Sequence, residues 1–164
     1  MRYHNITKDD MLNGDGLRVV LWLAGCDHHC KGCQNPLTWD ANTGLLFDQK
    51  TWAEIENELK KDYIQGITFS GGDPLHPANR FFVLNRLSPI IKDTYSKTVW
   101  IYTGYLWEDI KDLSGLENVD VLVDGPFMEE FKDINYPWGG STNQRVIDVQ
   151  ESLKTGNVIL YKSN

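Results

Sequence analysis

The sequence has no long apolar run and little positive charge. Its 164 residues contain no stretch near the roughly 18 consecutive apolar residues that suggest a membrane helix. Residues 1–16 hold no apolar segment typical of a secretion signal. These absences predict a cytoplasmic protein without a membrane span. With 16 Lys and Arg against 23 Asp and Glu, and a formal net charge of -7, we expect no nucleic-acid binding, because phosphate neutralisation needs clustered positive charge.

Internal repeats, low-complexity tracts and Pro/Ser-rich linkers are also absent. The composition, 41% hydrophobic and 24% charged, is that of an ordinary globular protein. A chain of 164 residues is long enough to bury a core without disulfides. We therefore expect a single domain over residues 1–164.

Apolar runs and helical periodicities alternate along the chain. Short β-branched runs predict buried strands at 18–24, 66–70, 98–102 and 119–123. Apolar residues at helical spacing predict helices at 48–61, 77–92 and 106–113. The second helix is expected to bury a face made of Phe81, Leu84, Leu87 and Ile91. Two later segments, 145–149 and 157–161, are interpreted as edge strands.

This alternation predicts an α/β fold with a mainly parallel sheet and helices on the outside. A complete eight-fold barrel needs about 250 residues, so we expect an incomplete (β/α) barrel. Reactive groups in such folds collect in loops at the carboxyl ends of the strands. Loops rich in Cys, Gly or polar residues follow the predicted strands at 26–33, 71–74, 103–104 and 124–126. We expect these loops to converge on one mouth.

The only cysteines are Cys26, Cys30 and Cys33, which share one eight-residue window. An odd count at this spacing is a poor disulfide framework and favours reduced thiolates. The spacing Cys-x3-Cys-x2-Cys suits one compact iron-sulfur cluster. Three ligands leave one metal position open for a substrate. All-thiolate clusters reach strongly negative potentials within their range of about -700 to +450 mV.

Two other interpretations of the cysteines stay open. A structural zinc site would take His28, His29, His4 or His76 as its fourth ligand. A catalytic cysteine would not explain why three of them share one loop. Taken singly, His28 and His29 are interpreted as surface loop residues, and no chemistry is assigned to them.

The cysteine spacing after a first strand resembles the radical S-adenosylmethionine (SAM) superfamily, whose members bind a site-differentiated 4Fe-4S cluster. More specifically, the chain is similar to the activating proteins of anaerobic (class III) ribonucleoside-triphosphate reductase. The segments that carry the resemblance fall within 13–18, 25–39, 65–75, 102–110, 123–125 and 138–145. They cover most of the chain.

The resemblance implies an activase of the radical SAM fold with a 4Fe-4S cluster and SAM as cofactors. A flavodoxin-like or other low-potential donor would supply an electron, and SAM would be cleaved to methionine and a 5'-deoxyadenosyl radical. That radical would generate a glycyl radical on the large catalytic subunit of the reductase. Cys26, Cys30 and Cys33 would be the cluster ligands and the catalytic residues.

A second motif, SGGDPL, follows the strand at 66–70. Gly71 and Gly72 let the backbone approach a ligand closely, and the carboxylate of Asp73 suits an α-amino group. By resemblance, this loop binds the methionine amino group of SAM. An ordinary turn in which Asp73 caps a helix is the alternative. The predicted cofactor-binding residues are Gly32, Cys33, Gln34, Gly71, Gly72 and Asp73.

Two alternative functions remain from the sequence. The first is an activating enzyme of pyruvate formate-lyase or of another glycyl-radical enzyme, against which the short chain and the segment 140–145 count. The second is a non-catalytic zinc-binding interaction module. We interpret 138–145 as part of the partner-facing surface, without assigning a site residue in it.

Overall fold

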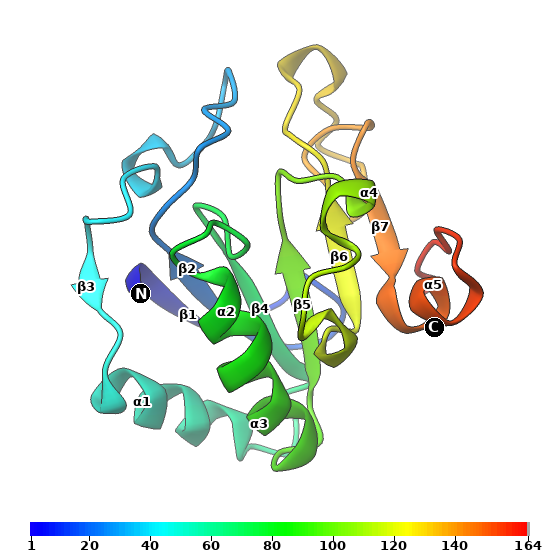
Figure 1. The fold of residues 1–164 in the computed structure, drawn as a ribbon. Coiled ribbons are helices and arrows are strands. Elements are labelled where there is room, and N and C mark those ends of the chain that lie inside the picture. The colour runs from blue at the N-terminus through cyan, green and yellow to red at the C-terminus, as the bar shows by residue number, and fades with distance from the viewer. Residues whose placement is uncertain (164) are drawn as a thin grey trace.

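The computed structural model describes residues 1–163. Its centre is a seven-stranded sheet of order β3-β1-β2-β4-β5-β6-β7 (Figure 1). The strands are β1 (Arg2–Asp10), β2 (Arg18–Leu23), β3 (Leu45–Leu46), β4 (Gly66–Gly71), β5 (Thr98–Tyr102), β6 (Val121–Asp124) and β7 (Arg145–Asp148). The α-helices are α1 (Gln49–Leu59), α2 (Arg80–Phe82), α3 (Ser88–Asp93), α4 (Trp107–Ile110) and α5 (Val149–Thr155). No helix within residues 1–163 has the length and apolar character to cross a bilayer.

The middle of the sheet is parallel and its margins are antiparallel. Strand β4 pairs in parallel with β2 and β5, and β5 pairs in parallel with β6. Strands β1, β3 and β7 pair antiparallel with their neighbours. The predicted α/β class and parallel centre are therefore confirmed. The sheet does not close into a barrel within residues 1–163, because β3 and β7 remain at its two edges.

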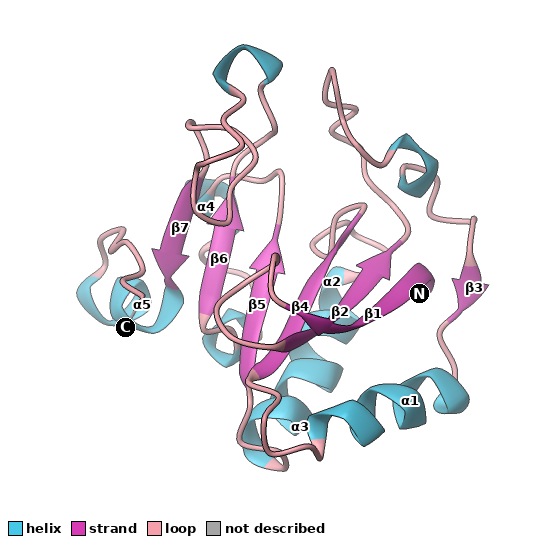
Figure 2. Ribbon diagram, turned by 180° about the vertical axis from the view of Figure 1, so that it is seen from behind, coloured by secondary structure: helices cyan, strands magenta, loops and turns pink. Residues whose placement is uncertain are grey.

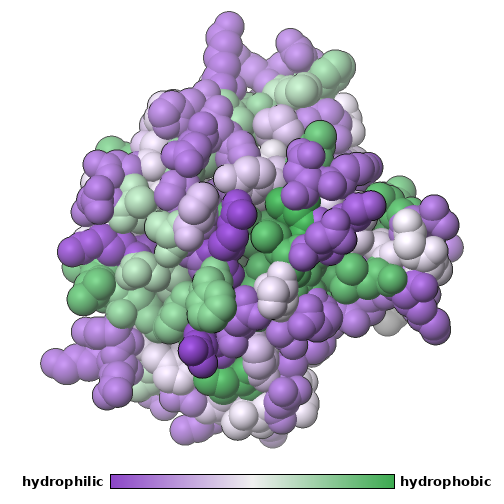
Figure 3. All heavy atoms as spheres, in the orientation of Figure 1, coloured by the Kyte–Doolittle hydropathy of each residue, from purple (hydrophilic) through white to green (hydrophobic). Residues whose placement is uncertain are grey.

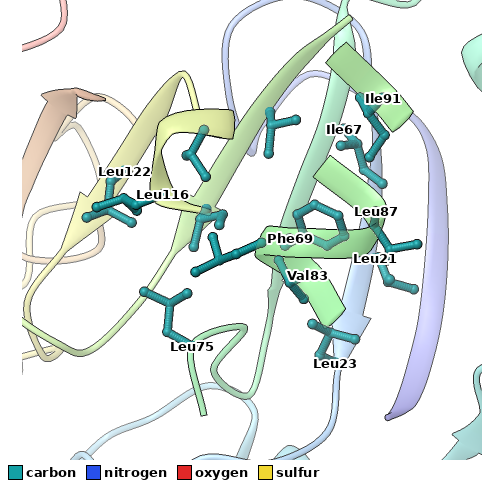
Figure 4. Close-up of a cluster of buried hydrophobic side chains, with 14 of the residues drawn as sticks. Leu21, Leu23, Ile67, Phe69, Leu75, Val83, Leu87, Ile91, Leu116 and Leu122 are labelled. Atoms are coloured by element: carbon teal, nitrogen blue, oxygen red, sulfur yellow. The ribbon is translucent and has the colours of Figure 1, made fainter. Parts of the chain in front are cut away.

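Helices α1 to α4 pack against one face of the sheet, and loops cross the other face (Figures 1 and 2). Alternate strand residues point into the helix layer, as the period of two requires. Figure 4 shows this core, where Ile67 and Phe69 of β4 lie among Val83, Leu87 and Ile91. The outer surface of the layer is mostly hydrophilic, with apolar side chains exposed between the polar ones (Figure 3).

The predicted helix at 77–92 is partly wrong. The α-helix begins at Arg80, and a π-helical segment, Val83–Leu87, interrupts it before α3. The wider turn shifts the buried face, so Val83 is buried while Phe81 is 61% exposed. The Ser88 hydroxyl donates to the Val83 carbonyl at 2.7 Å inside this interruption. A prediction from apolar spacing assumes 3.6 residues per turn, so it cannot foresee the extra residue that a π-helical turn contains.

The other helices and the edges differ more mildly from prediction. The helix expected at 48–61 is α1, whose first turn is capped by the Asp48 carboxylate accepting the Thr51 N–H at 2.9 Å. The helix expected at 106–113 is shorter in the structure, where α4 covers only Trp107–Ile110. The edge strand at 145–149 is confirmed as β7, whereas 157–161 contributes no strand to the described chain and only a single bridge at Leu160.

Among the strands and α-helices, three were not expected from the sequence: β1, β3 and α5. Strand β1 is rich in charged and polar residues and has few apolar ones, so it lacks the apolar run of a buried strand. It forms because β2 offers it an edge, with Tyr3 opposite Leu23 and Ile6 opposite Leu21. Strand β3 is two residues long, below what periodicity can detect.

Candidate active site

The loops that follow β2, β4, β5 and β6 meet in one pocket, as predicted. They rise together above the carboxyl ends of these strands (Figure 1). Parallel strands bring these ends to the same edge of the sheet, which explains the convergence. The residues of these loops that line the pocket include Cys26, Cys30, Cys33, Gly71, Gly72, Asp73, Thr103, Gly104 and Gly125.

The three thiols lie in a loop that folds back on itself. The Cys26 N–H donates to the Trp39 carbonyl at 3.0 Å, which holds the loop base. The Cys33 N–H donates to the Cys30 carbonyl at 3.1 Å, and the Asn35 N–H points to the Cys33 sulfur at 3.4 Å. All three thiols are partly exposed and form no disulfide. That the cysteines are reduced thiolates stays a prediction.

The donor set fits an iron-sulfur cluster. Burial raises the pKa of the Cys26 thiol to about 11, so a thiolate there needs a nearby cation such as a metal ion. Three thiols facing one pocket match the soft ligands that such clusters take. The one mixed ligand group found among residues 1–163 is Cys26, His28 and Asp73, with ligand atoms within 4.8 Å of one another. A zinc ion in this group would leave Cys30 and Cys33 unused, whereas an iron-sulfur cluster can take all three thiolates.

Asp73 is 1% exposed and is the centre of a hydrogen-bond network. Its carboxylate accepts the Leu75 N–H at 2.9 Å, the Thr103 hydroxyl at 2.8 Å and the Gly104 N–H at 2.9 Å. Its Oδ2 lies 2.6 Å from Nε2 of His28. These donors come from the loops after β2, β4 and β5, so one carboxylate connects them. The bond to Asp73 raises the pKa of His28.

The predicted cofactor residues divide into two groups. Gly71, Gly72 and Asp73 line the pocket beside the thiols. A Cβ on Gly72 would lie 2.6 Å from the Gly25 carbonyl oxygen, so the close approach of these two loops requires glycine. Gly32 and Gln34 are exposed and are not brought to the pocket wall. A Cβ on Gly32 would instead lie 3.2 Å from the Glu129 side chain.

The interpretation of His28 as a surface residue is wrong. Its side chain is 18% exposed and turns inward to Asp73, while its neighbour His29 is exposed and stacks on Trp39 with ring centroids 4.5 Å apart. In the sequence the two histidines are adjacent and equivalent. Only the path of the loop distinguishes them.

Tyr102 is a second pocket residue that the sequence did not single out as a site. Its hydroxyl is buried and has no hydrogen-bond partner among the described residues. Burial raises the pKa of this phenol, so it stays protonated. The hydroxyl therefore keeps a hydrogen-bond donor that no described residue uses.

The segment 138–145 reaches the same pocket through Gln144. The Gln144 side chain accepts the Gly140 N–H at 2.8 Å and donates to the Gly125 carbonyl at 3.0 Å. The next residue, Arg145, binds both oxygens of Glu108 at 2.9 and 2.8 Å and also contacts buried Asp124. These bonds hold the wall of the pocket that follows β6. A partner-facing role for the segment stays a prediction.

Comparison with known proteins gives consistent results. The family model of the 4Fe-4S single cluster domain matches residues 12–147. Proteins named anaerobic ribonucleoside-triphosphate reductase-activating protein are similar over nearly their whole length. The one from Enterobacteria phage T4 is 45% identical over 146 residues, 89% of this chain and 93% of the relative. Those from Haemophilus influenzae and Escherichia coli K12 are each 39% identical, covering 88% and 89% of this chain and 96% and 97% of the relatives.

Proposed function

Because the chain belongs to the family of anaerobic ribonucleoside-triphosphate reductase-activating proteins, we propose that it is the radical SAM activase of such a reductase. The observation that carries the proposal is the position of all three cysteines on one pocket beside the Gly71–Asp73 loop. The open sheet with a parallel centre supports an incomplete barrel of the radical SAM type.

In this proposal Cys26, Cys30 and Cys33 hold the 4Fe-4S cluster and leave one iron without a protein ligand. When bound, the cluster would supply the one electron needed to cleave SAM reductively to methionine and a 5'-deoxyadenosyl radical, and that radical would take a hydrogen atom from the Cα of a glycine in the reductase and leave as 5'-deoxyadenosine. The electron comes from a low-potential donor such as a flavodoxin. The reaction would take place in the pocket at the base of the converging loops.

SAM would lie along the loop after β4. Gly71 and Gly72 expose backbone to the pocket, and the buried charge of Asp73 favours the cationic amino group. The Asp73 carboxylate already accepts several donors, so the carbonyls of this loop would take most of the hydrogen bonds from that group. Cys33 would approach the cofactor from the cysteine loop, because it lines the pocket whereas Gly32 and Gln34 do not.

The partner would be the large catalytic subunit of the anaerobic reductase. An open sheet leaves the pocket reachable by a loop of a second protein, which suits a macromolecular substrate. The segment after β6 lines the pocket through Phe127 and also carries the exposed aromatic residue Phe131.

Electron paramagnetic resonance tests the proposal. Anaerobically prepared protein is reduced and mixed with SAM and, in separate samples, with the large reductase subunit or pyruvate formate-lyase. We expect a glycyl radical signal with the reductase subunit. A signal only with pyruvate formate-lyase would mean that this enzyme, and not the reductase subunit, is the substrate. A colourless protein that carries one zinc ion would contradict the radical proposal.

A further inference from the structure

His28 sits in the middle of the cysteine loop, between Cys26 and Cys30. The base of this loop is tied to the loop after β4 by the Asp73 N–H, which donates to the Gly25 carbonyl at 2.6 Å. Further out along the loop, the His28 ring makes a second connection through Nε2 to Asp73 Oδ2 at 2.6 Å. Two bonds to one residue therefore orient the thiol-bearing loop.

The loop after β5 surrounds the same imidazole. The Tyr105 ring packs edge-on against it, with centroids 4.6 Å apart. Thr103 and Gly104 donate to the carboxylate that His28 contacts. The imidazole thus touches, directly or through Asp73, both of the loops that lie opposite the thiols.

The position of the His28 ring explains why residue 104 is a glycine. A Cβ on Gly104 would lie 2.5 Å from Cδ2 of the imidazole, closer than real Cβ contacts. The φ angle of Gly104 lies outside the left-handed region that favours glycine. Alanine would therefore be tolerated by the backbone at this position, and the three closest contacts of its Cβ would all be with the ring.

From these contacts we propose that His28 is a positioning residue that locks the cysteine loop onto the SAM-binding loops. The inference rests on the proposed function and deepens it. His28 acts through Asp73 and needs no contact with the reacting atoms. Groups that orient metal ligands in this indirect way typically change affinity or activity by about 10- to 100-fold when removed.

The test is a double-mutant cycle with a matched control. The variants are His28→Ala, Gly104→Ala, the two combined, and His29→Ala, which removes the neighbouring exposed imidazole. Three quantities are measured: iron and sulfide content, the SAM dissociation constant of cluster-loaded protein by equilibrium dialysis, and amide hydrogen exchange of residues 26–33 in the cluster-free protein.

We expect His28→Ala to retain iron, to raise the SAM dissociation constant by about tenfold or more, and to speed exchange in the cysteine loop. Gly104→Ala should do the same, because its methyl group displaces the ring. In the His28→Ala background it should add almost nothing, because the clash is gone. His28→Gln, which can donate an amide N–H to Asp73, should recover part of the affinity. His29→Ala should behave like the wild type.

Unchanged SAM affinity in His28→Ala would overturn the proposal, and so would additive effects of the two substitutions. Loss of iron from His28→Ala alone would make the residue a metal ligand, which also contradicts a positioning role. Wild-type protein that holds no cluster would defeat the proposed function. Amide exchange in the cluster-free protein would then still test whether His28 positions the cysteine loop. Equal exchange rates in His28→Ala and His29→Ala would refute this role, and faster exchange in His28→Ala would support it.

Discussion

The two ends of the parallel strands each bury one charged side chain, with different results. At the amino end, Arg18 is 1% exposed, and its guanidinium donates to the Thr68 and Thr98 hydroxyls and to neighbouring carbonyls at 2.8 to 3.1 Å. At the carboxyl end, Asp73 is equally buried and accepts donors from the surrounding loops. Both charges are well hydrogen-bonded, which is the condition for burying them.

The difference lies in what surrounds each charge. Trp100 packs beside Arg18, with the guanidinium 5.4 Å from the ring centroid, and Tyr161 and Trp138 cover that ring. Beside Asp73, the three thiols face the pocket. The amino end therefore stabilises the sheet, and the carboxyl end presents reactive groups, as expected of strand–helix folds with a parallel sheet.

The largest expected effect is at the carboxyl end. Replacing Cys26, Cys30 or Cys33 by Ala should abolish cluster binding and SAM cleavage, because two thiolates do not hold a 4Fe-4S cluster. Iron analysis and measurement of 5'-deoxyadenosine check this. The thiols are partly exposed, so the free energy of unfolding of the cluster-free protein should change by less than about 1 kcal/mol. Continued deoxyadenosine formation in any one variant would contradict the assignment of the ligands.

At the amino end the effect should appear in stability. Arg18→Met should lower the free energy of unfolding by about 3 kcal/mol or more, since buried acceptors around the guanidinium lose their donor. Urea unfolding of the cluster-free protein measures it. Arg86→Met, at an exposed position, is the control and should change stability by no more than about 0.5 kcal/mol. A stability loss equal to that of the control would remove the contrast between the two ends.

A smaller effect of opposite sign is expected at Tyr102. Tyr102→Phe removes a buried hydroxyl that has no partner within residues 1–163, so cluster-free protein should gain up to about 1 kcal/mol. Tyr136→Phe is the matched control, because the Tyr136 hydroxyl donates to the Gln144 carbonyl at 2.5 Å. That variant should lose about 1 kcal/mol. If Tyr102→Phe is the less stable of the two, the hydroxyl is not available for a ligand.

The smallest effect concerns the exposed ion pair of Glu108 and Arg145. The hydrogen bonds from Arg145 lower the pKa of Glu108 to about 2, against about 4.3 in an unfolded chain. The pair therefore contributes fully above about pH 4.3 and is lost as the pH falls toward 2. Because Glu108 is exposed, the Glu108→Gln variant should differ from the wild type by no more than about 1 kcal/mol at pH 7. Unfolding curves at pH 7 and pH 3 check whether that difference shrinks.

The parallel centre was predictable because its strands are buried on both faces. In runs such as 18–24 and 98–102 every residue after the first is apolar, so the runs stand out in the sequence. The convergence of the following loops also needs no coordinates, since it follows from parallel pairing. Strand β1 carries no such pattern. Its place depends on pairing with β2, which is a long-range property.

The site was predictable for the residues that carry a motif and not for those that complete it. Cysteine spacing and the Gly71–Gly72 pair are local features. The roles of His28 and Tyr102 depend on what lies opposite them, and an unpartnered hydroxyl or a buried imidazole has no local pattern. The predicted contribution of Gly32 and Gln34 also depends on the loop path, which turns both outward.

By itself, the sequence determined the α/β class, the three thiols and the order in which the loops follow the strands, because each of these depends on composition or spacing within a short segment. The tertiary structure alone decided which histidine turns inward, why position 104 has no side chain, and where the π-helical turn shifts the buried face. Those features arise where segments far apart in the chain compete for the same space, and a linear pattern does not record that competition.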